Sequence, residues 1–144
     1  MINMKDITAG VETVLSNALA GYTIERNPRR NQDANTAALN KGWIGIYRGG
    51  LDYDAHTTGS QPWLAKPSVI VEVQAASFLS GEDAEDRLQD AEQEVMNALT
   101  ADKKLDGTVN MTTGYEIRYE INEDEEAEIY FHAALITIKA EVRS

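Results

Sequence analysis

The chain has 144 residues, of which 42% are hydrophobic, 26% are charged and none is cysteine. These values are typical of a soluble globular domain with one sizeable core, and the lack of cysteine excludes disulfides, thiolate zinc sites and cysteine nucleophiles. The formal net charge is −11, with about +2 on residues 1–50 and −13 on residues 51–144. This balance argues against broad binding to nucleic acid. It favours either simple solubility or a negative surface that repels DNA or meets a positive patch on a neighbour.

No stretch of the sequence approaches the ~18 apolar residues of a membrane span, and the first fifteen residues lack the pattern of a secretion signal. We therefore expect a protein that is made in a cytoplasm, has no membrane partner, and is used or assembled there.

The N-terminal segment is predicted to be a helix over residues 5–20. Asn3 or Asp6 is a suitable N-cap, and Gly21 stands where a glycine often ends a helix. A short strand is predicted at residues 22–27, followed by a polar loop and a second strand at 43–49. The apolar stripe of the helix consists of Ile7, Val11, Val14, Leu15, Ala18 and Leu19.

Residues 49–67 contain three glycines and two prolines and show no periodicity, so we predict a long loop. Loops of this length in compact domains usually have a function. Tyr53 and Trp63 are large side chains of the kind that anchor interfaces, although Trp63 is equally compatible with folding back onto the core.

A third strand is predicted at residues 68–78, with Val69, Val71 and Val73 on its core face. Ser80 is the expected N-cap of a second helix that extends to about residue 100, with acidic residues in its first turn. Residues 82–94 contain seven carboxylates and one arginine, a pattern typical of a solvated face. The apolar stripe of this helix is Ala84, Leu88, Ala91, Val95 and Leu99.

The C-terminal part is predicted to be a connector (101–114), a strand (115–122), an acidic turn and a return strand (128–140), forming a closing β-hairpin. The return strand is apolar on both faces, so it is either covered on both sides or in contact with another subunit. The order of elements predicts one α+β domain over residues 1–144. Its mixed or antiparallel sheet would have about five strands, with two main helices packed on it.

Candidate chemistry is sparse. Asp52, Asp54 and His56 alternate in the predicted loop and form a weak candidate for a hard divalent cation. We regard a solvated loop as the better interpretation and assign no metal ion.

Glu72 and Glu116 are a candidate carboxylate pair if the strands bring them together, and a solvent-facing sheet surface explains them equally well. His132 lies in an apolar strand, where a hydrogen-bonded core or interface residue is expected rather than a catalyst. Nucleotide-binding glycine patterns and serine-nucleophile motifs are absent. The sequence therefore predicts no catalytic residue, no cofactor and no enzymatic activity.

A cluster of arginine and lysine residues within residues 26–48 contrasts with the general acidity of the chain. The arginine guanidinium group is well suited to binding carboxylates. The same chain supplies carboxylates at residues 82–94 and 123–126, so a head-to-tail contact between copies is one interpretation. Intramolecular or solvated arginines are the alternative. The cluster comprises Arg26, Arg29, Arg30, Lys41 and Arg48. The interface candidates are Arg26, Arg29, Arg30, Arg48, Tyr53, Trp63, Glu123, Asp124, Glu125 and Glu126.

Five segments together define the layout of the chain. These are the helix "MKDITAGVETVLSNAL", the segment "YTIERNPRRNQ", the strand "KPSVIVEVQAAS", the helix "EDAEDRLQDAEQEVMNAL" with "LDG" soon after it, and the closing hairpin. In this layout the chain resembles, over nearly its whole length, the tail terminator, or tail completion, proteins of long-tailed bacteriophages. Small head-completion and neck proteins share much of this layout.

The resemblance implies a structural virion protein that forms a homohexameric ring on the head-proximal end of the tail tube. The ring would stop tube polymerisation, offer a docking surface to neck or head-tail connector proteins, and let double-stranded DNA pass through its channel. The segments at 49–67 and 122–127 would be candidates for contacts with these partners. The alternatives are another neck component, such as a head-tail adaptor or stopper, and an unrelated soluble α+β binding protein.

Overall fold

The computed structural model describes residues 2–28, 41–54, 64–124 and 128–143. The described strands form one sheet in the order β1-β2-β3-β5-β4, in which β1 and β2 are parallel and all other neighbours are antiparallel. The predicted α+β class, the mixed five-stranded sheet, the two main helices and the closing hairpin are confirmed. In chain order the elements are α1 (Met4–Ala18), β1 (Thr23–Arg26), β2 (Trp43–Asp54), β3 (Leu64–Ser77), α3 (Gly81–Ala101), β4 (Met111–Asp124) and β5 (Ile129–Arg143).

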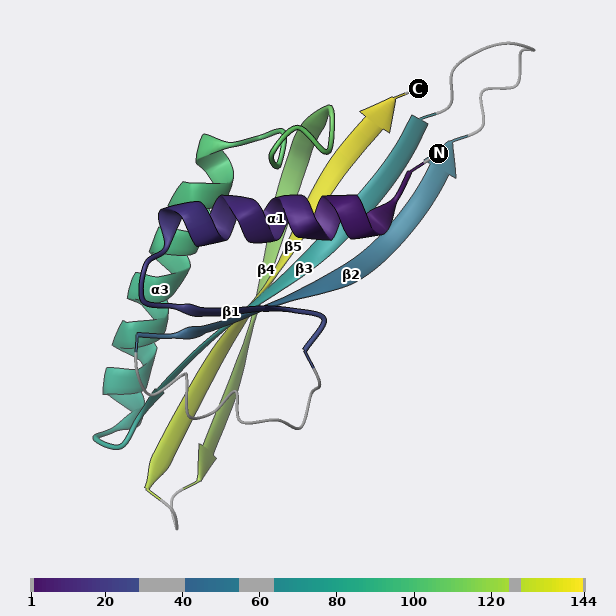
Figure 1. The fold of residues 1–144 in the computed structure, drawn as a ribbon. Coiled ribbons are helices and arrows are strands. Elements are labelled where there is room, and N and C mark those ends of the chain that lie inside the picture. Colours follow the sequence, from purple (N-terminus) through teal and green to yellow (C-terminus); the bar gives the residue numbers. More distant parts are fainter. Residues whose placement is uncertain (1, 29–40, 55–63, 125–127, 144) are drawn as a thin grey trace, which may run out of the picture.

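Both helices contribute to the same hydrophobic core, on one face of the sheet. Figure 1 shows α1 crossing the strands, while α3 runs along one side of the sheet and packs over β3 and β5. Alternate residues of β3 face this core, as the sequence predicts, since Val69, Val71 and Val73 are at most 1% exposed. The other core side chains from the sheet include Ile44, Ile46, Ala134, Ile136 and Ile138.

Helix α1 begins as the sequence predicts, and Asn3 rather than Asp6 is its N-cap. The Asn3 side chain accepts a hydrogen bond from the Lys5 amide at 3.0 Å. The apolar stripe packs into the core, with Val11 and Leu15 fully buried. Ala18 is the exception, because the helix ends at this residue, two positions earlier than predicted, and leaves it exposed. The chain then turns through Gly21, whose φ of +89° is a conformation that favours glycine.

Helix α3 is capped by Ser80, whose hydroxyl accepts a hydrogen bond from the Asp83 amide at 3.0 Å. The narrow apolar stripe is confirmed, because Leu88 and Val95 are at most 1% exposed. Among the described residues the helix therefore contributes a single apolar stripe to the core, and its acidic side chains line the remaining surface.

The predicted long loop at 49–67 is wrong at both ends, because residues 49–54 belong to β2 and residues 64–67 to β3. The two strands pair in register on either side of an irregularity between Arg48 and Leu51. Here the Ser68 hydroxyl accepts a hydrogen bond from the Gly50 amide at 2.7 Å. Pro67 is tolerated because it lies opposite Leu51 next to this bulge. Residues 55–63, with His56 and Trp63, lie outside the described residues.

The hairpin strands are longer than the sequence predicts. Strand β4 begins at Met111, inside the predicted connector, and β5 continues to Arg143. Strand β5 lies between β3 and β4, so its hydrogen-bonding edges are both occupied. Its core face packs under the helices, whereas Phe131 and Leu135 project from the opposite face, which no described helix covers.

Candidate interaction surfaces

The described residues contain no group of three or more metal-ligating side chains suited to a metal ion. Asp52 and Asp54 lie on strand β2 rather than in a loop, and Asp54 forms an ion pair with Lys66 at 2.8 Å. None of the described helices is long and apolar enough to span a membrane.

The suggested pairing of Glu72 with Glu116 is wrong. Strand β5 separates their strands, and the two carboxylates have different partners. Glu72 accepts a hydrogen bond from Tyr47, while Glu116 forms ion pairs with Arg118 and Lys139. This pair therefore cannot act as a shared acid and base.

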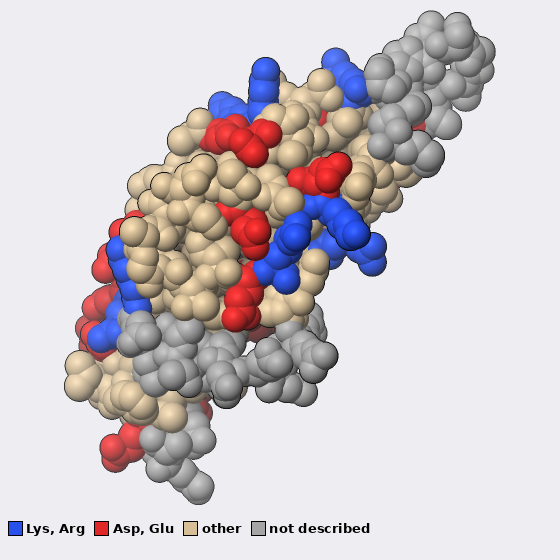
Figure 2. Space-filling view, in the orientation of Figure 1, with Lys and Arg blue, Asp and Glu red and all other residues tan. Residues whose placement is uncertain are grey.

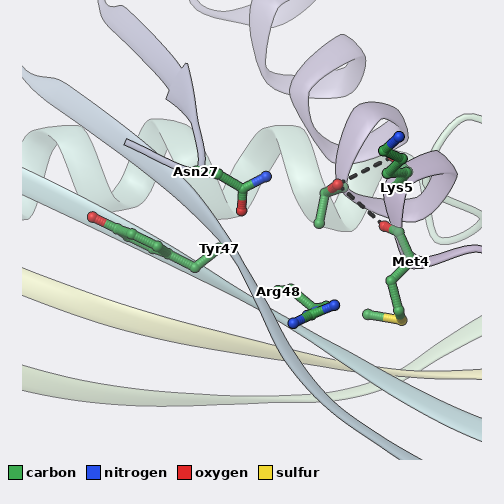
Figure 3. A pocket seen from close by; sticks show the side chains of 6 residues that line it. Met4, Lys5, Asn27, Tyr47 and Arg48 are labelled. Atoms are coloured by element: carbon green, nitrogen blue, oxygen red, sulfur yellow. Dashed lines mark hydrogen bonds between the residues drawn. The ribbon is translucent and has the colours of Figure 1, made fainter. Parts of the chain in front are cut away.

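A groove of about 470 Å³ lies where β1 ends, beside the part of β2 with which no described strand pairs on that side. We call it the cationic groove. In Figure 3, Met4 and Lys5 from the first turn of α1 lie on one side, Asn27 and Tyr47 lie on the other, and Arg48 lies between them. The α1 turn is tied to β1 nearby, because Arg26 donates a hydrogen bond to the Lys5 carbonyl oxygen at 3.4 Å.

The cations at this groove are partly predicted by the sequence. Arg48 lines the groove, and Arg26 lies beside it through its hydrogen bond to the Lys5 carbonyl oxygen. Lys5, which also lines the groove, does not belong to the positive cluster that the sequence predicts. Lys41 is not part of the groove, since its ammonium lies over the Tyr22 ring and donates to the Ala20 carbonyl oxygen. In Figure 2, blue atoms gather between the beginning of α1 and the end of β1, with some red atoms at their border.

Arg48 and Lys5 have no recorded ion pair with a described carboxylate, and Arg48 is exposed. Two cationic side chains thus line a concave surface without neutralising partners among the described residues. Such an arrangement suits a carboxylate-bearing ligand or surface.

The exposed face of α3 carries a second charged surface, which we call the acidic ridge. Glu82, Asp86, Asp90 and Glu94 follow each other at every fourth position, and all four are exposed. Such residues are neighbours on a helix, and like charges at this spacing disfavour the helix. Glu94 accepts a hydrogen bond from the Tyr22 hydroxyl, and burial together with this contact raises the pKa of Tyr22. Among the described residues, the other three carboxylates have no recorded ion pair.

Between α3 and β4 the carboxylates are instead bound within the molecule. His132 is 5% exposed and contacts two of them, Glu85 through Nδ1 at 2.5 Å and Glu123 through Nε2 at 3.0 Å. Burial lowers the pKa of His132, but the two carboxylates raise it more, so the net shift is upward. The expected hydrogen-bonded core histidine is confirmed. Close by, the Tyr119 hydroxyl donates to Glu92 at 2.6 Å, which raises the pKa of Tyr119 to about 12.

Apolar groups remain exposed at this end of the molecule. In β4, Tyr119 is 57% and Ile121 is 66% exposed, and in the turn after β3 Leu79 is 78% exposed. Strand β4 is also an edge strand of 14 residues, so one row of its backbone groups is unpaired among the described residues. Long edges with apolar side chains favour association with another chain.

The interface candidates from the sequence divide into three groups. Arg48 lines the cationic groove, Arg26 lies beside it, and Tyr53 is 44% exposed on β2. Glu123 is bound to His132, and Asp124 ends β4. The remaining candidates lie outside the described residues: Arg29, Arg30, Trp63, Glu125 and Glu126.

Comparison with known proteins gives no family for this chain. No protein-family model matches it, and no curated protein matches it. One solved structure with a similar fold is a chain described as "Virion of native gene transfer agent (GTA) particle". It has 14% sequence identity and a TM-score of 0.47, with 93% of each chain covered. At this level of similarity the match carries no argument about function.

Proposed function

We propose that this protein is a structural component of a virion, and specifically a tail terminator. Copies of the chain form a ring that caps the tail tube, stops its polymerisation and presents a docking surface to the neck, with DNA passing through the channel. The layout of the sequence, which resembles tail terminator proteins, supports this role.

The observation that carries the proposal is a contrast within the described surface. One sheet face has no described helix over it, and the outer edge of β4, which pairs with no other described strand, bears exposed Tyr119 and Ile121. The described residues contain no metal-ligand cluster, and buried His132 is held between two carboxylates. Surfaces that are suited to association, without a group suited to catalysis, are typical of an assembly component.

The charge of the chain is compatible with this role. At a net charge of −11, a ring of many copies repels the phosphate backbone of DNA. A protein that lines a DNA channel without holding the DNA benefits from such a charge, because phosphate binding depends on cationic side chains.

The test is electron microscopy of particles produced from the encoding genome after deletion of this coding sequence. A tail terminator predicts overlong tubes without heads. Tubes of normal length that fail to join heads would assign the chain to another neck component, such as an adaptor or stopper. Normal, infectious particles would contradict a virion role. The remaining hypothesis would then be an unrelated soluble α+β binding protein.

A further inference from the structure

We infer that the cationic groove of one copy receives the acidic ridge of the next copy, and that this contact joins the subunits of the assembly. This inference rests on the proposed function, because it specifies how the ring is held together. The occupant of the groove is therefore a second copy of this chain, bound through its helix α3.

The charges of the two surfaces are complementary. Lys5 and Arg48 line the groove, and Arg26 holds the α1 turn beside it. On the ridge, Glu82, Asp86 and Asp90 are exposed and have no recorded ion pair with a described cation. Contact between the surfaces gives each set of charges the partners that the described part of a single copy does not provide.

The shapes of the two surfaces also correspond. The groove is a concave opening of about 470 Å³ at a sheet edge, and the ridge is the convex outer face of a helix of 21 residues. Carboxylates four positions apart on a helix are spaced at about 6 Å along its axis. Two neighbouring carboxylates of the ridge can therefore reach different cations along the groove.

The location of the surfaces determines the kind of assembly. The groove involves α1, β1 and β2, whereas the ridge belongs to α3, which packs over β3 and β5 and reaches Tyr22 before β1 through Glu94. Two different patches meet in such a contact. A row of joined copies therefore has an unoccupied groove at one end and an unoccupied ridge at the other. A heterologous contact of this type closes into a ring where the rotation between neighbouring subunits returns to the start, and otherwise continues as a filament; the proposed function requires the closed form.

Charge exchange tests the contact directly. In the groove variant, Lys5→Glu and Arg48→Glu make the groove negative, and in the ridge variant, Asp86→Lys and Asp90→Lys make the ridge positive. Each variant alone then opposes like charges, and we expect its self-association to weaken by about tenfold or more. In an equimolar mixture every groove meets a ridge of opposite charge, so the mixture should assemble with alternating subunits.

Sedimentation velocity of each variant and of the mixture, at low and high salt, measures the assembly. The control is Lys103→Glu with Lys104→Glu, which changes the net charge as the groove variant does but at an exposed turn elsewhere; it should assemble like the wild type. Circular dichroism verifies that each variant is folded. Assembly of the groove variant at wild-type strength, or a mixture that stays dissociated, overturns the contact while leaving a ring possible. A wild-type chain that never associates overturns both the contact and the proposed function.

Discussion

The Nδ1 atom of His132 lies 2.5 Å from Oε2 of Glu85, and this contact connects the central hairpin strand β5 to helix α3. The imidazole also contacts Glu123 on β4, so one side chain links three elements. The histidine is buried, while its two carboxylates are about a third exposed. The arrangement therefore stabilises the packing of α3 against the end of the hairpin, and its strength depends on pH.

The first prediction concerns this pH dependence. The pKa of His132 is raised by its carboxylates despite burial, and the hydrogen bond from His132 lowers the pKa of Glu85. The histidine contribution is complete below its ordinary pKa of 6.5 and is lost as pH rises through the folded value. The Glu85 contribution is complete above 4.5 and is lost as pH falls through its folded value. The interaction is thus strongest between these two limits.

His132→Gln should reduce the free energy of unfolding by about 1–2 kcal/mol at pH 5.5, since both partners are partly exposed to water. The reduction should be smaller at pH 8.5, where the wild-type histidine has lost more of its charge. Urea unfolding of both proteins at the two pH values measures the difference. An equal loss at both values would show that the charge of His132 contributes nothing.

The second prediction concerns the start of helix α3. Ser80→Ala removes the acceptor for the Asp83 amide and should cost about 1 kcal/mol of unfolding free energy. Ser80→Asp is the matched control, because aspartate is an equally good N-cap and its charge suits a helix N-terminus. Thermal unfolding should place Ser80→Asp close to the wild type. An equal loss of stability in Ser80→Ala and Ser80→Asp would show that the loss does not come from removal of the N-cap hydrogen bond.

A third prediction compares two leucines of opposite exposure. Leu88 is 1% exposed in the core under α3, and Leu79 is 78% exposed in the turn before it. Leu88→Ala should destabilise the protein by about 2–5 kcal/mol, because it removes buried contacts and leaves a cavity. Leu79→Ala should change stability by less than about 0.5 kcal/mol. Chemical denaturation at one protein concentration tests the pair, and similar losses would contradict the assigned core.

The fourth prediction concerns the close approach of α1 to the turn before β4. A β-carbon at Gly10 would overlap the Leu105 carbonyl oxygen and the Thr108 side chain, whereas one at Gly114 has no atom within 4 Å. Alanine in a helix gains about 0.5–1 kcal/mol over glycine, but forced shifts in a packed region cost about 1–3 kcal/mol. Gly10→Ala should therefore be net destabilising in thermal unfolding, and Gly114→Ala should be tolerated. A stabilised Gly10→Ala protein would show that α1 is free to move away.

The elements with strong local signals follow from the sequence. The apolar stripe of α1 is predicted by hydrophobic periodicity, and the Ser80 cap of α3 is predicted by the type of residue at the start of the helix. The extension of β2 and β3 could not be predicted, because glycines and Pro67 normally mark loops, and here a bulge accommodates them. The added residues of β2 and β3 are strand because they pair with each other, and a local sequence pattern does not show which distant residues will pair.

The candidate surfaces show the same limit. The sequence indicates Arg26 and Arg48 because they belong to a cationic stretch, but Lys5 reaches the groove only through the packing of α1 beside the end of β1. The parallel pairing of β1 with β2 ends at Ile46, so Arg48 lies beyond the part of β2 that β1 covers. The sequence predicts that Glu123 is available for a partner at the acidic hairpin tip, whereas its contact with His132 depends on the register of β4 against β5.

The central claim is that this protein functions by associating with copies of itself. Sedimentation velocity of the wild-type chain, over a range of concentrations and at low and high salt, tests it most directly. The account predicts a discrete ring whose mass is a whole multiple of the 15.9 kDa chain and which dissociates more readily at high salt. A chain that remains monomeric under all of these conditions would contradict the account.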